Sequence, residues 1–456
     1  MPNNQPSNLM TRESSSTSQE SFSRSFSPSV EVVIGAAALT AVVLFIYRDA
    51  FRAYFFNDDF QWLQGARTFA AFNPLRLGRY SGQFYRPVIE IYFLVGRRVL
   101  GCNPFAFHLA SVLIHLLNTA VLYKFARSLV KGAAFAALTA VFFAFQPGYV
   151  QAVVWVGAIT DLLPALWYLL TLWSFLLFLE GRGRVFYVSA IATFTLCLLT
   201  HESSATVLVL MIALDAMMTA NRGDHVYARL ANRLRAYFPF AVLLTGYLSL
   251  EYVLSRHSYL ITEGHYRFGW HAVPHALDYL ISLYVGPHII VSRMVVALVL
   301  VALLLRGTPR VRFFVFWMLV TIAPASFFTW DNVSRYLYLP AAGFAMLLAE
   351  TMLAISRLHL PRIPAQASRV SAVVMTVAIS TRFASFAAIT PAGFREETQP
   401  FERLASAVQR SRTVESAGPV VYVDRASVDG VPASLRDRVA EVASCSSEVH
   451  VAVRPD

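Results

Sequence analysis

Residues 105–129 read FAFHLASVLIHLLNTAVLYKFARSL, an apolar run in which Lys124 and Arg127 are the only charged side chains. A helix of about 20 apolar residues spans the hydrocarbon core of a bilayer, so this run predicts a membrane-spanning helix. The rest of the chain has the same character, since 56% of its residues are hydrophobic, 14% are charged and the mean hydropathy is +0.53. A soluble domain carries roughly a quarter charged residues. The composition therefore predicts an all-α polytopic membrane protein.

The chain contains about eleven apolar runs of membrane-spanning length. Their boundaries lie near residues 31–48, 105–129, 132–147, 161–180, 185–200, 203–220, 236–254, 278–305, 311–329, 336–356 and 370–390. With the N-terminus in the cytoplasm, the short internal loops are rich in Arg and Lys, whereas the external loops near 148–160 and 200–202 contain neither. This bias follows the positive-inside rule and places the loop 49–104 and the C-terminus outside. The net charge is +11, but the basic residues lie between the apolar runs and form no single stripe. Nucleic acid is therefore not expected as a partner.

The sequence predicts three segments. Residues 1–30 contain ten serines and no apolar periodicity, so we expect a disordered cytosolic tail and not a signal peptide. Residues 31–390 form the expected transmembrane domain, and residues 391–456 a small extracytoplasmic α/β segment. In that segment a strand, a helix and a strand are predicted at 420–423, 433–444 and 449–453. A unit of this size buries little core alone, so it should dock on the membrane domain or dimerise.

The chain has three cysteines, Cys102, Cys197 and Cys445. Their spacing is typical of neither a metal site nor a redox motif, and Cys197 lies in an apolar run. We therefore expect no essential disulfide.

The first loop, residues 49–104, is long and alternates aromatic residues with arginines. Its pattern favours two short interfacial helices that flank a Pro- and Gly-rich turn at Asn73–Pro87. The arginines of this loop can bind lipid phosphates, or they can act as snorkelling anchors at the membrane surface. They are Arg52, Arg67, Arg76, Arg79, Arg86, Arg97 and Arg98.

An acidic pair, Asp58 and Asp59, follows the first apolar run by about ten residues. A carboxylate at the membrane surface can take a proton from an acceptor while a lipid-borne donor lies against the protein. The alternative is a solvated turn before an interfacial helix. The polar residues in the other apolar runs favour the catalytic interpretation.

The run at 105–129 contains three polar residues on one helical face, His108, His115 and Asn118. Such a face should look into the protein and not into lipid. Two roles remain open for it, which are hydrogen bonding between helices and a position near a functional site.

Polar residues also gather where the predicted helices reach the outer side. Gln151 and Asp161 lie at the outer ends of the third and fourth runs, and His201 and Glu202 lie where the fifth and sixth runs meet. A Glu at such a junction is costly unless it is paired or hydrated, which favours a functional role. His201 is a candidate ligand for a metal or a phosphate, although one His and one Glu are weak evidence for a metal.

The tenth run is preceded by Asp331 and Arg335. The planar guanidinium of Arg335 is suited to bind a phosphate through two hydrogen bonds. The alternative is an ion pair between Arg335 and Asp331.

The acidic pair and four further stretches occur in an order that resembles the GT-C class of integral-membrane glycosyltransferases. The stretches are FHLASVLIHLLNTAVLY (107–123), FQPGYVQAVVWVGAITDLL (145–163), THESSATVLVLMIALD (200–215) and RYLYLPAAGF (335–344). Over roughly residues 31–390 the chain looks like bacterial relatives of the dolichyl-phosphate-mannose protein O-mannosyltransferases, including the type with tetratricopeptide repeats. The resemblance implies a sugar donor on a polyprenyl phosphate and an acidic base, Asp58 or Asp59. It also implies a donor-phosphate or structural role for Glu202 and Arg335.

The chain departs from this family pattern at three positions. Gln146 stands where relatives often have His before Pro, Thr160 where Arg precedes the Asp, and His201 where Lys precedes the Glu. Two cations are therefore missing near the expected phosphate, and His201 replaces only one, which leaves the donor open. No period of about 34 residues follows the membrane domain, so recognition of proteins by tetratricopeptide repeats is not assumed.

Together these features predict an inverting glycosyltransferase that acts at the outer face of the membrane. Asp58 is the expected base and Asp59 the second choice. The residues expected at the donor site are His201, Glu202, Arg335, Asp331, Asp161 and His115. No metal is expected to be obligatory, because a monophosphate leaving group does not require one.

The expected partners are the lipid-linked donor, membrane lipids and a protein or glycan acceptor. The expected location is a bacterial inner membrane. Two alternatives remain, a transporter or flippase and an inactive relative that acts in assembly of a surface polymer. A transporter typically shows an internal repeat, which is not evident in this sequence.

Overall fold

The computed structural model describes residues 30–66, 84–221, 233–284, 286, 288–330, 333–358, 364–414, 419–446 and 449–454. Internal contacts divide the chain into two units, Met1–Ala41 and Val42–Asp456. The packing described below lies within the second unit. The tail expected at residues 1–30 lies outside the described residues, apart from Val30.

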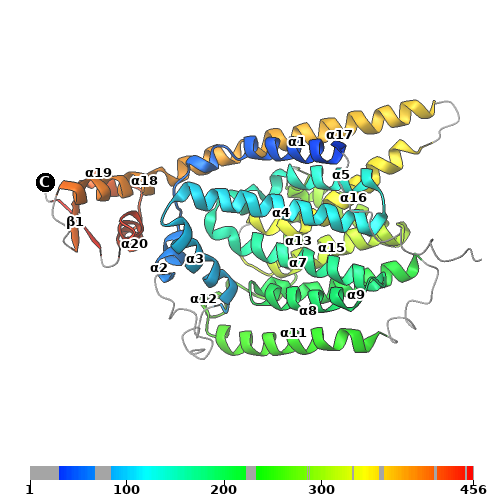
Figure 1. Ribbon diagram of the computed structural model, residues 1–456, viewed down its shortest axis with the longest axis horizontal. Coiled ribbons are helices and arrows are strands. Elements are labelled where there is room, and N and C mark those ends of the chain that lie inside the picture. The colour runs from blue at the N-terminus through cyan, green and yellow to red at the C-terminus, as the bar shows by residue number, and fades with distance from the viewer. Residues whose placement is uncertain are drawn as a thin grey trace, which may run out of the picture. The chain divides into compact units, whose positions relative to one another are not determined.

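Each of the eleven predicted apolar runs contains a helix (Figure 1). These helices are α1 (Val30–Ile46), α4 (Pro104–Val130), α5 (Ala133–Ala144), α7 (Ile159–Leu179), α8 (Arg184–Leu198), α9 (Val207–Ala220), α11 (Leu234–Ser255), α14 (Ile290–Arg306), α15 (Pro309–Ser326), α16 (Tyr338–Ser356) and α17 (Ala365–Ala387). The run expected at 278–305 is divided, because a separate helix, α13 (Ala272–Ser282), precedes α14.

Not all of these helices are long enough to cross a membrane alone. In the described part of the chain, six helices are long and apolar enough, or seven if α5 and the bent segment after it form one span. That segment comprises η4 (Pro147–Tyr149) and α6 (Val150–Val154), at 45° to α5. The helices α1 and α8 are apolar but shorter, with 17 and 15 residues. The all-α membrane architecture is confirmed, whereas the number of eleven spans remains a prediction.

The core of the bundle forms around α7, which packs between α4 and α8 (Figure 1). In the most apolar stretch of this span 72% of the residues are buried, a larger share than in any other candidate span among the described residues. A helix that is apolar on all sides is typical of such a central position. Its Tyr168 contacts Trp317 of α15, and both rings are buried.

Short helices and turns gather at one side of the bundle, around the beginnings of α7, α9 and α16 (Figure 1). They are η1 (Ala50–Arg52), α2 (Asp58–Gly65), α3 (Pro87–Leu100), η5 (Val156–Ala158), η6 (Glu202–Thr206), α12 (Tyr259–Thr262) and η7 (Ser334–Leu337). Helix α3 begins with a proline, whose missing N–H costs nothing at that position. The helices α2 and α3 confirm the two short helices expected in the first loop, and residues 67–83 between them lie outside the described part.

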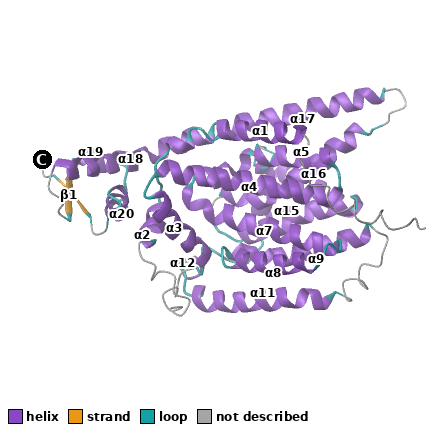
Figure 2. Ribbon diagram, in the orientation of Figure 1, coloured by secondary structure: helices purple, strands orange, loops and turns teal. Residues whose placement is uncertain are grey.

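The C-terminal segment contains the predicted strand, helix and strand in order, together with two helices that the sequence pattern did not predict, at Thr390–Val414 and Arg425–Val428. After α17 come α18 (Thr390–Val414), β1 (Val420–Val423), α19 (Arg425–Val428), α20 (Ala433–Ala443) and β2 (His450–Val453). The strands pair in parallel, with Val420 opposite His450. Within the described residues, strands occur only in this segment (Figure 2). A parallel pair needs a crossover connection, which α20 supplies here.

This segment docks on helix α2 of the first loop. Gln64 Nε2 donates a hydrogen bond of 2.7 Å to Glu441 Oε2 of α20. Cys445, just beyond α20, forms a disulfide with Cys102 in the turn between α3 and α4, with 5.8 Å between the Cα atoms. No essential disulfide was expected from the sequence, whereas the structure links these two cysteines by one. The two cysteines are 343 residues apart, so only the docking of α20 brings them together.

Candidate active site

A cavity of about 1300 Å³ lies among the helix ends that carry the short turns. Aromatic side chains form much of its wall, including Trp62, Tyr259 and Trp330. Its charged lining includes Asp58, Arg86, Asp161, His201, Glu202, Glu251 and Arg335. Five of the predicted site residues, Asp58, Asp161, His201, Glu202 and Arg335, therefore share one cavity although they are far apart in sequence.

The two aspartates at the start of α2 have different surroundings. Asp58 is exposed and lines the cavity. Asp59 is completely buried and accepts two backbone hydrogen bonds, from the N–H of Phe56 at 2.8 Å and from the N–H of Gly157 at 2.5 Å. The solvated turn considered above is thus absent at Asp59. Asp58 is the carboxylate that a substrate in the cavity would meet.

Burial raises the pKa of Asp59 to about 8, although the hydrogen bonds from Phe56 and Gly157 oppose this shift. The negative charge of Asp58 raises the pKa of Asp59 further. Asp59 joins α2 to η5, because its carboxyl group bridges the backbone of both segments. This arrangement indicates a structural contribution from Asp59.

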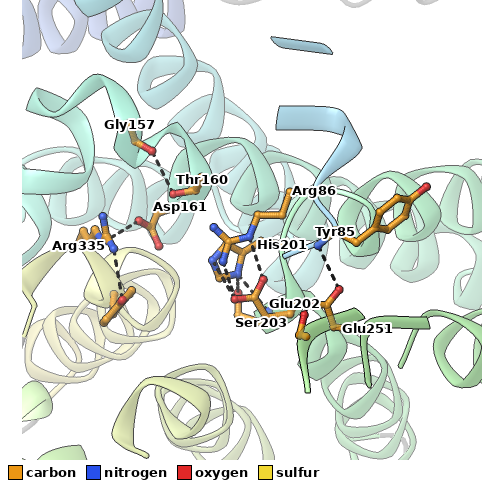
Figure 3. A network of polar contacts seen from close by, with 12 residues as sticks. Tyr85, Arg86, Gly157, Thr160, Asp161, His201, Glu202, Ser203, Glu251 and Arg335 are labelled. Atoms are coloured by element: carbon orange, nitrogen blue, oxygen red, sulfur yellow. Dashed lines mark hydrogen bonds and ion pairs between the residues drawn. The ribbon is translucent and has the colours of Figure 1, made fainter. Parts of the chain in front are cut away.

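Arg86 and Glu202 form a bidentate ion pair at the cavity wall (Figure 3). Arg86 Nε lies 3.0 Å from Glu202 Oε2, and Nη2 lies 2.6 Å from Oε1. The pair connects the start of α3 to η6, and the backbone N–H of Val88 also donates to Leu199 O at 3.2 Å. Parallel N–H···O bonds of this kind hold the guanidinium plane in one orientation.

His201 precedes this pair and caps η6. Its Nδ1 accepts a hydrogen bond of 3.2 Å from the N–H of Ser203, and its Nε2 lies 3.6 Å from Glu202 Oε1. Burial lowers the pKa of His201 to about 3, and the charges of Arg86 and Arg335 lower it further, while Glu202 opposes them. A neutral imidazole donates a hydrogen bond but brings no positive charge. The lowered pKa does not favour the prediction that His201 replaces one of the missing cations.

Arg335 lies beside Asp161 (Figure 3). Its guanidinium also lies over the rings of Trp155 and Tyr336. Its Nε is 3.5 Å from Asp161 Oδ2, and its guanidinium carbon is 4.7 Å from the centre of a Trp155 ring. Arg335 Nε and Asp161 Oδ2 are buried and form no hydrogen bond to the described residues. The guanidinium is thus oriented by its neighbours at the cavity wall.

The sequence does not single out Arg86 or Glu251, two of the charged residues of the cavity wall. Glu251 of α11 accepts a hydrogen bond of 2.5 Å from Ser255 and a longer one, 3.4 Å, from the N–H of Tyr85. Arg86 is one of seven arginines in the first loop, and only one sequence signal sets it apart from the others. That signal is Pro87, because a proline marks the start of a helix and so fixes the backbone beside Arg86.

The remaining predicted site residues have other positions. His115 is buried outside the cavity wall, where its Nδ1 is 2.8 Å from the hydroxyl of Tyr338. Asn118 donates to the same hydroxyl and to Leu162 O. This agrees with hydrogen bonding between helices, and His115 reaches the cavity only through Tyr338, which lines it. Asp331 lies outside the described residues.

The described residues contain no group of three or more His, Cys, Asp or Glu side chains arranged to hold a metal ion. The chemistry available in the cavity is that of an exposed carboxylate and two guanidinium groups. Each guanidinium is held by a separate acid, Arg86 by Glu202 and Arg335 by Asp161.

The helical bundle resembles the GT-C class of membrane glycosyltransferases, and the chain is an integral membrane protein. It is 28% identical over 218 residues to protein O-mannosyl-transferase TMTC1 of Mus musculus and 27% identical over 215 residues to that of Homo sapiens. These alignments cover 42% of this chain but only 23% and 24% of the relatives. The matched part therefore spans about a quarter of the length of these proteins. No family model matches the chain.

The fold is similar to that in the crystal structure of ArnT from Cupriavidus metallidurans bound to undecaprenyl phosphate. The TM-score is 0.51 at 14% sequence identity, and the alignment covers 93% of this chain and 90% of ArnT. At this identity the similarity establishes the fold.

Proposed function

We propose that this chain is a membrane glycosyltransferase that transfers a sugar from a polyprenyl phosphate to an acceptor hydroxyl with inversion. The observation that carries the proposal is one cavity that is lined by both the exposed Asp58 and Arg335. The similarity to protein O-mannosyl-transferases supports a sugar as the transferred group. The fold shared with a protein bound to undecaprenyl phosphate supports a lipid-linked donor.

In the proposed reaction Asp58 takes the proton of the acceptor hydroxyl as that oxygen attacks the anomeric carbon. The bond between the anomeric carbon and the phosphate oxygen breaks at the same time, and the polyprenyl phosphate leaves with the bonding electrons. A single displacement of this kind inverts the configuration at the anomeric carbon. Asp59 serves α2 as a structural anchor and is the second choice for the base.

The leaving phosphate requires positive charge at the point where its own charge develops. Arg335 lines the same cavity as Asp58, so it is our first candidate. Arg86 is our second, with Glu202 and Asp161 orienting the two guanidinium groups and His201 donating a hydrogen bond. A monophosphate can leave with this assistance alone, so we propose that no metal is obligatory. Transfer should then persist in excess chelator.

The proposal includes an orientation in the membrane. Residues 1–30 form a cytosolic tail, residues 31–390 the membrane domain, and residues 391–456 an extracytoplasmic segment in a bacterial inner membrane. Two observations support it. The helix ends that form the cavity lie opposite to the basic short loops, and a disulfide is typical of an oxidising compartment.

The function is tested with purified protein, radiolabelled polyprenyl-phosphate sugars and a crude envelope fraction that supplies protein, lipid and glycan acceptors. We expect label in an acceptor and release of unlabelled polyprenyl phosphate. If every donor kept its label, the proposed activity would be wrong. Movement of intact donor across a vesicle without cleavage would instead indicate a flippase.

A further inference from the structure

The rear of helix α2 and the residues before it pack against α18. The Phe60 ring is fully buried and lies 5.4 Å from Phe401, and the Phe56 ring lies 5.6 Å from the same residue. The backbone N–H of Tyr54 donates a hydrogen bond of 3.0 Å to Oγ1 of Thr398, which is also fully buried. Residues 54–60 thus rest on α18 through apolar and polar contacts.

The C-terminal end of α2 is attached to α20. Glu441, which is only 7% exposed, accepts the hydrogen bond from Gln64. The disulfide between Cys102 and Cys445 then closes the connection between α20 and the turn after α3. In Figure 1 these C-terminal elements lie beside α2 at the same side of the bundle.

Asp58 and Gln61 of α2 line the cavity, and Gln64 reaches the cavity wall beside its hydrogen bond to Glu441. The helix has only eight residues, and isolated helices of this length are unstable in water. Its order must therefore come from tertiary contacts. On the cavity side Trp62 of α2 stacks on Phe93 of α3 at 5.5 Å, so contacts with α3 and η5 supply that order together with those from α18 and α20.

We propose that the C-terminal segment is a positioning element of the active site. By holding α2 from behind, α18 and α20 keep Asp58 projecting into the cavity, and the Cys102–Cys445 bond keeps α20 in place. Phe401, Glu441 and Cys445 act through α2 and are not part of the cavity wall. The catalytic consequence rests on the function proposed above, whereas the structural consequence does not.

The disulfide provides a reversible test. A dithiol reductant breaks the S–S bond by transfer of two electrons and two protons, which leaves the Cys102 and Cys445 thiols and an oxidised cyclic dithiol. Amide hydrogen exchange of residues 58–65 should become faster on reduction, and equally so in Cys445→Ser without reductant. Turnover should fall by about 10- to 100-fold, the loss typical of a catalytic group displaced by about 1 Å, while KM for the donor changes little.

Cys197→Ser is the matched control, because the Cys197 thiol is buried in α8 and forms no disulfide. It should respond to reductant as the wild type does, and reoxidation should restore both. Cys445→Ser should show no further response to reductant. If Cys445→Ser does not fold, Phe401→Leu keeps the disulfide and removes only ring contacts, and it should produce a smaller increase in exchange at α2.

The two proposals fail in different ways. Unchanged exchange at α2 in both reduced protein and Phe401→Leu would overturn the positioning role, whatever the activity. Faster exchange at α2 with full turnover would also overturn it. Faster exchange in a protein whose wild type transfers no sugar would support the positioning of α2 and count against the glycosyltransferase.

Discussion

Asp58 and Asp59 are neighbours in the chain, but their carboxyl groups have opposite environments. Successive residues of a helix point about 100° apart, so α2 turns one aspartate to the cavity and the other to η5. Asp58 remains accessible, whereas both oxygens of Asp59 accept backbone N–H groups. A proton acceptor needs a free lone pair directed at its substrate, which only Asp58 offers.

Replacing Asp58 by Asn keeps the shape of the side chain and removes the base. We expect turnover to fall by about 10²–10⁴-fold, the usual contribution of a general base. The melting temperature in detergent should be unchanged, because Asp58 is exposed. If Asp58→Asn and Asp59→Asn both retained near-wild-type turnover, the mechanism would be wrong.

The buried Asp59 should make stability depend on pH. Its pKa of about 8 in the folded protein is above its ordinary value, so the folded state holds a proton that the unfolded state releases. The resulting stabilisation is complete below about pH 4 and is lost as the pH rises through about 8. Asn at position 59 has no such proton to lose. Melting temperatures of the wild type should therefore fall relative to Asp59→Asn from about pH 6 to about pH 9. A constant difference over this range would contradict the raised pKa.

Two substitutions of Arg335 separate the effect of its charge from that of its planar shape. Arg335→Lys keeps the charge but loses the planar fork, so donor binding should weaken and persist. Arg335→Ala should weaken it far more, because Asp161 then loses its partner as well. Binding of a fluorescent polyprenyl phosphate to the two variants measures the difference. Equal affinity in Arg335→Ala and the wild type would exclude Arg335 from the donor site.

The elements α2 and η5 are in close contact at Gly157. A Cβ atom at this residue would lie 2.9 Å from Asp59 Oδ1 and 3.2 Å from Trp155 Nε1. Gly157→Ala should therefore push α2 away and lower turnover by about 10-fold or more. Gly246→Ala in α11 is the control, since nothing lies within 4 Å of its added methyl group. Initial rates and proteolysis near α2 compare the two, and equal rates would show that the α2–η5 contact is not needed.

The elements themselves follow from local patterns. Apolar length predicts α4 and α7, and alternation with a short helix predicts β1, α20 and β2, because these signals reside in consecutive residues. The break between α13 and α14 was not predicted. Apolar length alone predicts a single run over 278–305, and so it misses this break. Gly286 and Pro287 stand at the break.

The contacts that build the site are less accessible from sequence. That Glu202 and Arg335 reach the same cavity follows from the predicted topology, since both were expected at outer helix ends. That Glu202 pairs with Arg86, 116 residues away, depends on how α3 meets η6, and no local pattern encodes it. The same applies to Glu251, which resembles any other acid near a helix end until the helices are packed.

At the scale of the whole molecule, the proposed orientation places the cavity and the C-terminal segment on one side of the membrane. Glu263 is exposed near the cavity, and Arg182 is exposed in a loop at the other helix ends. Glu263→Cys should react with an impermeant maleimide in intact cells, and Arg182→Cys only after lysis. The opposite pattern would invert the topology and place the proposed reaction in the cytoplasm.

The bond between Cys102 and Cys445 also sets an order of events during biogenesis. A ribosome that adds about 5–20 residues per second needs roughly 20–70 s to reach the second cysteine after the first. During that interval the Cys102 thiol has already been synthesised, while α20 does not yet exist to receive it. The attachment of α20 beside α2, the helix that carries Asp58, can therefore be completed only late in synthesis. If Cys102 formed a mixed disulfide with glutathione or with another chain before α20 was made, the membrane helices would assemble without the Cys102–Cys445 bond. The site would then lack the contact that holds α20 beside α2.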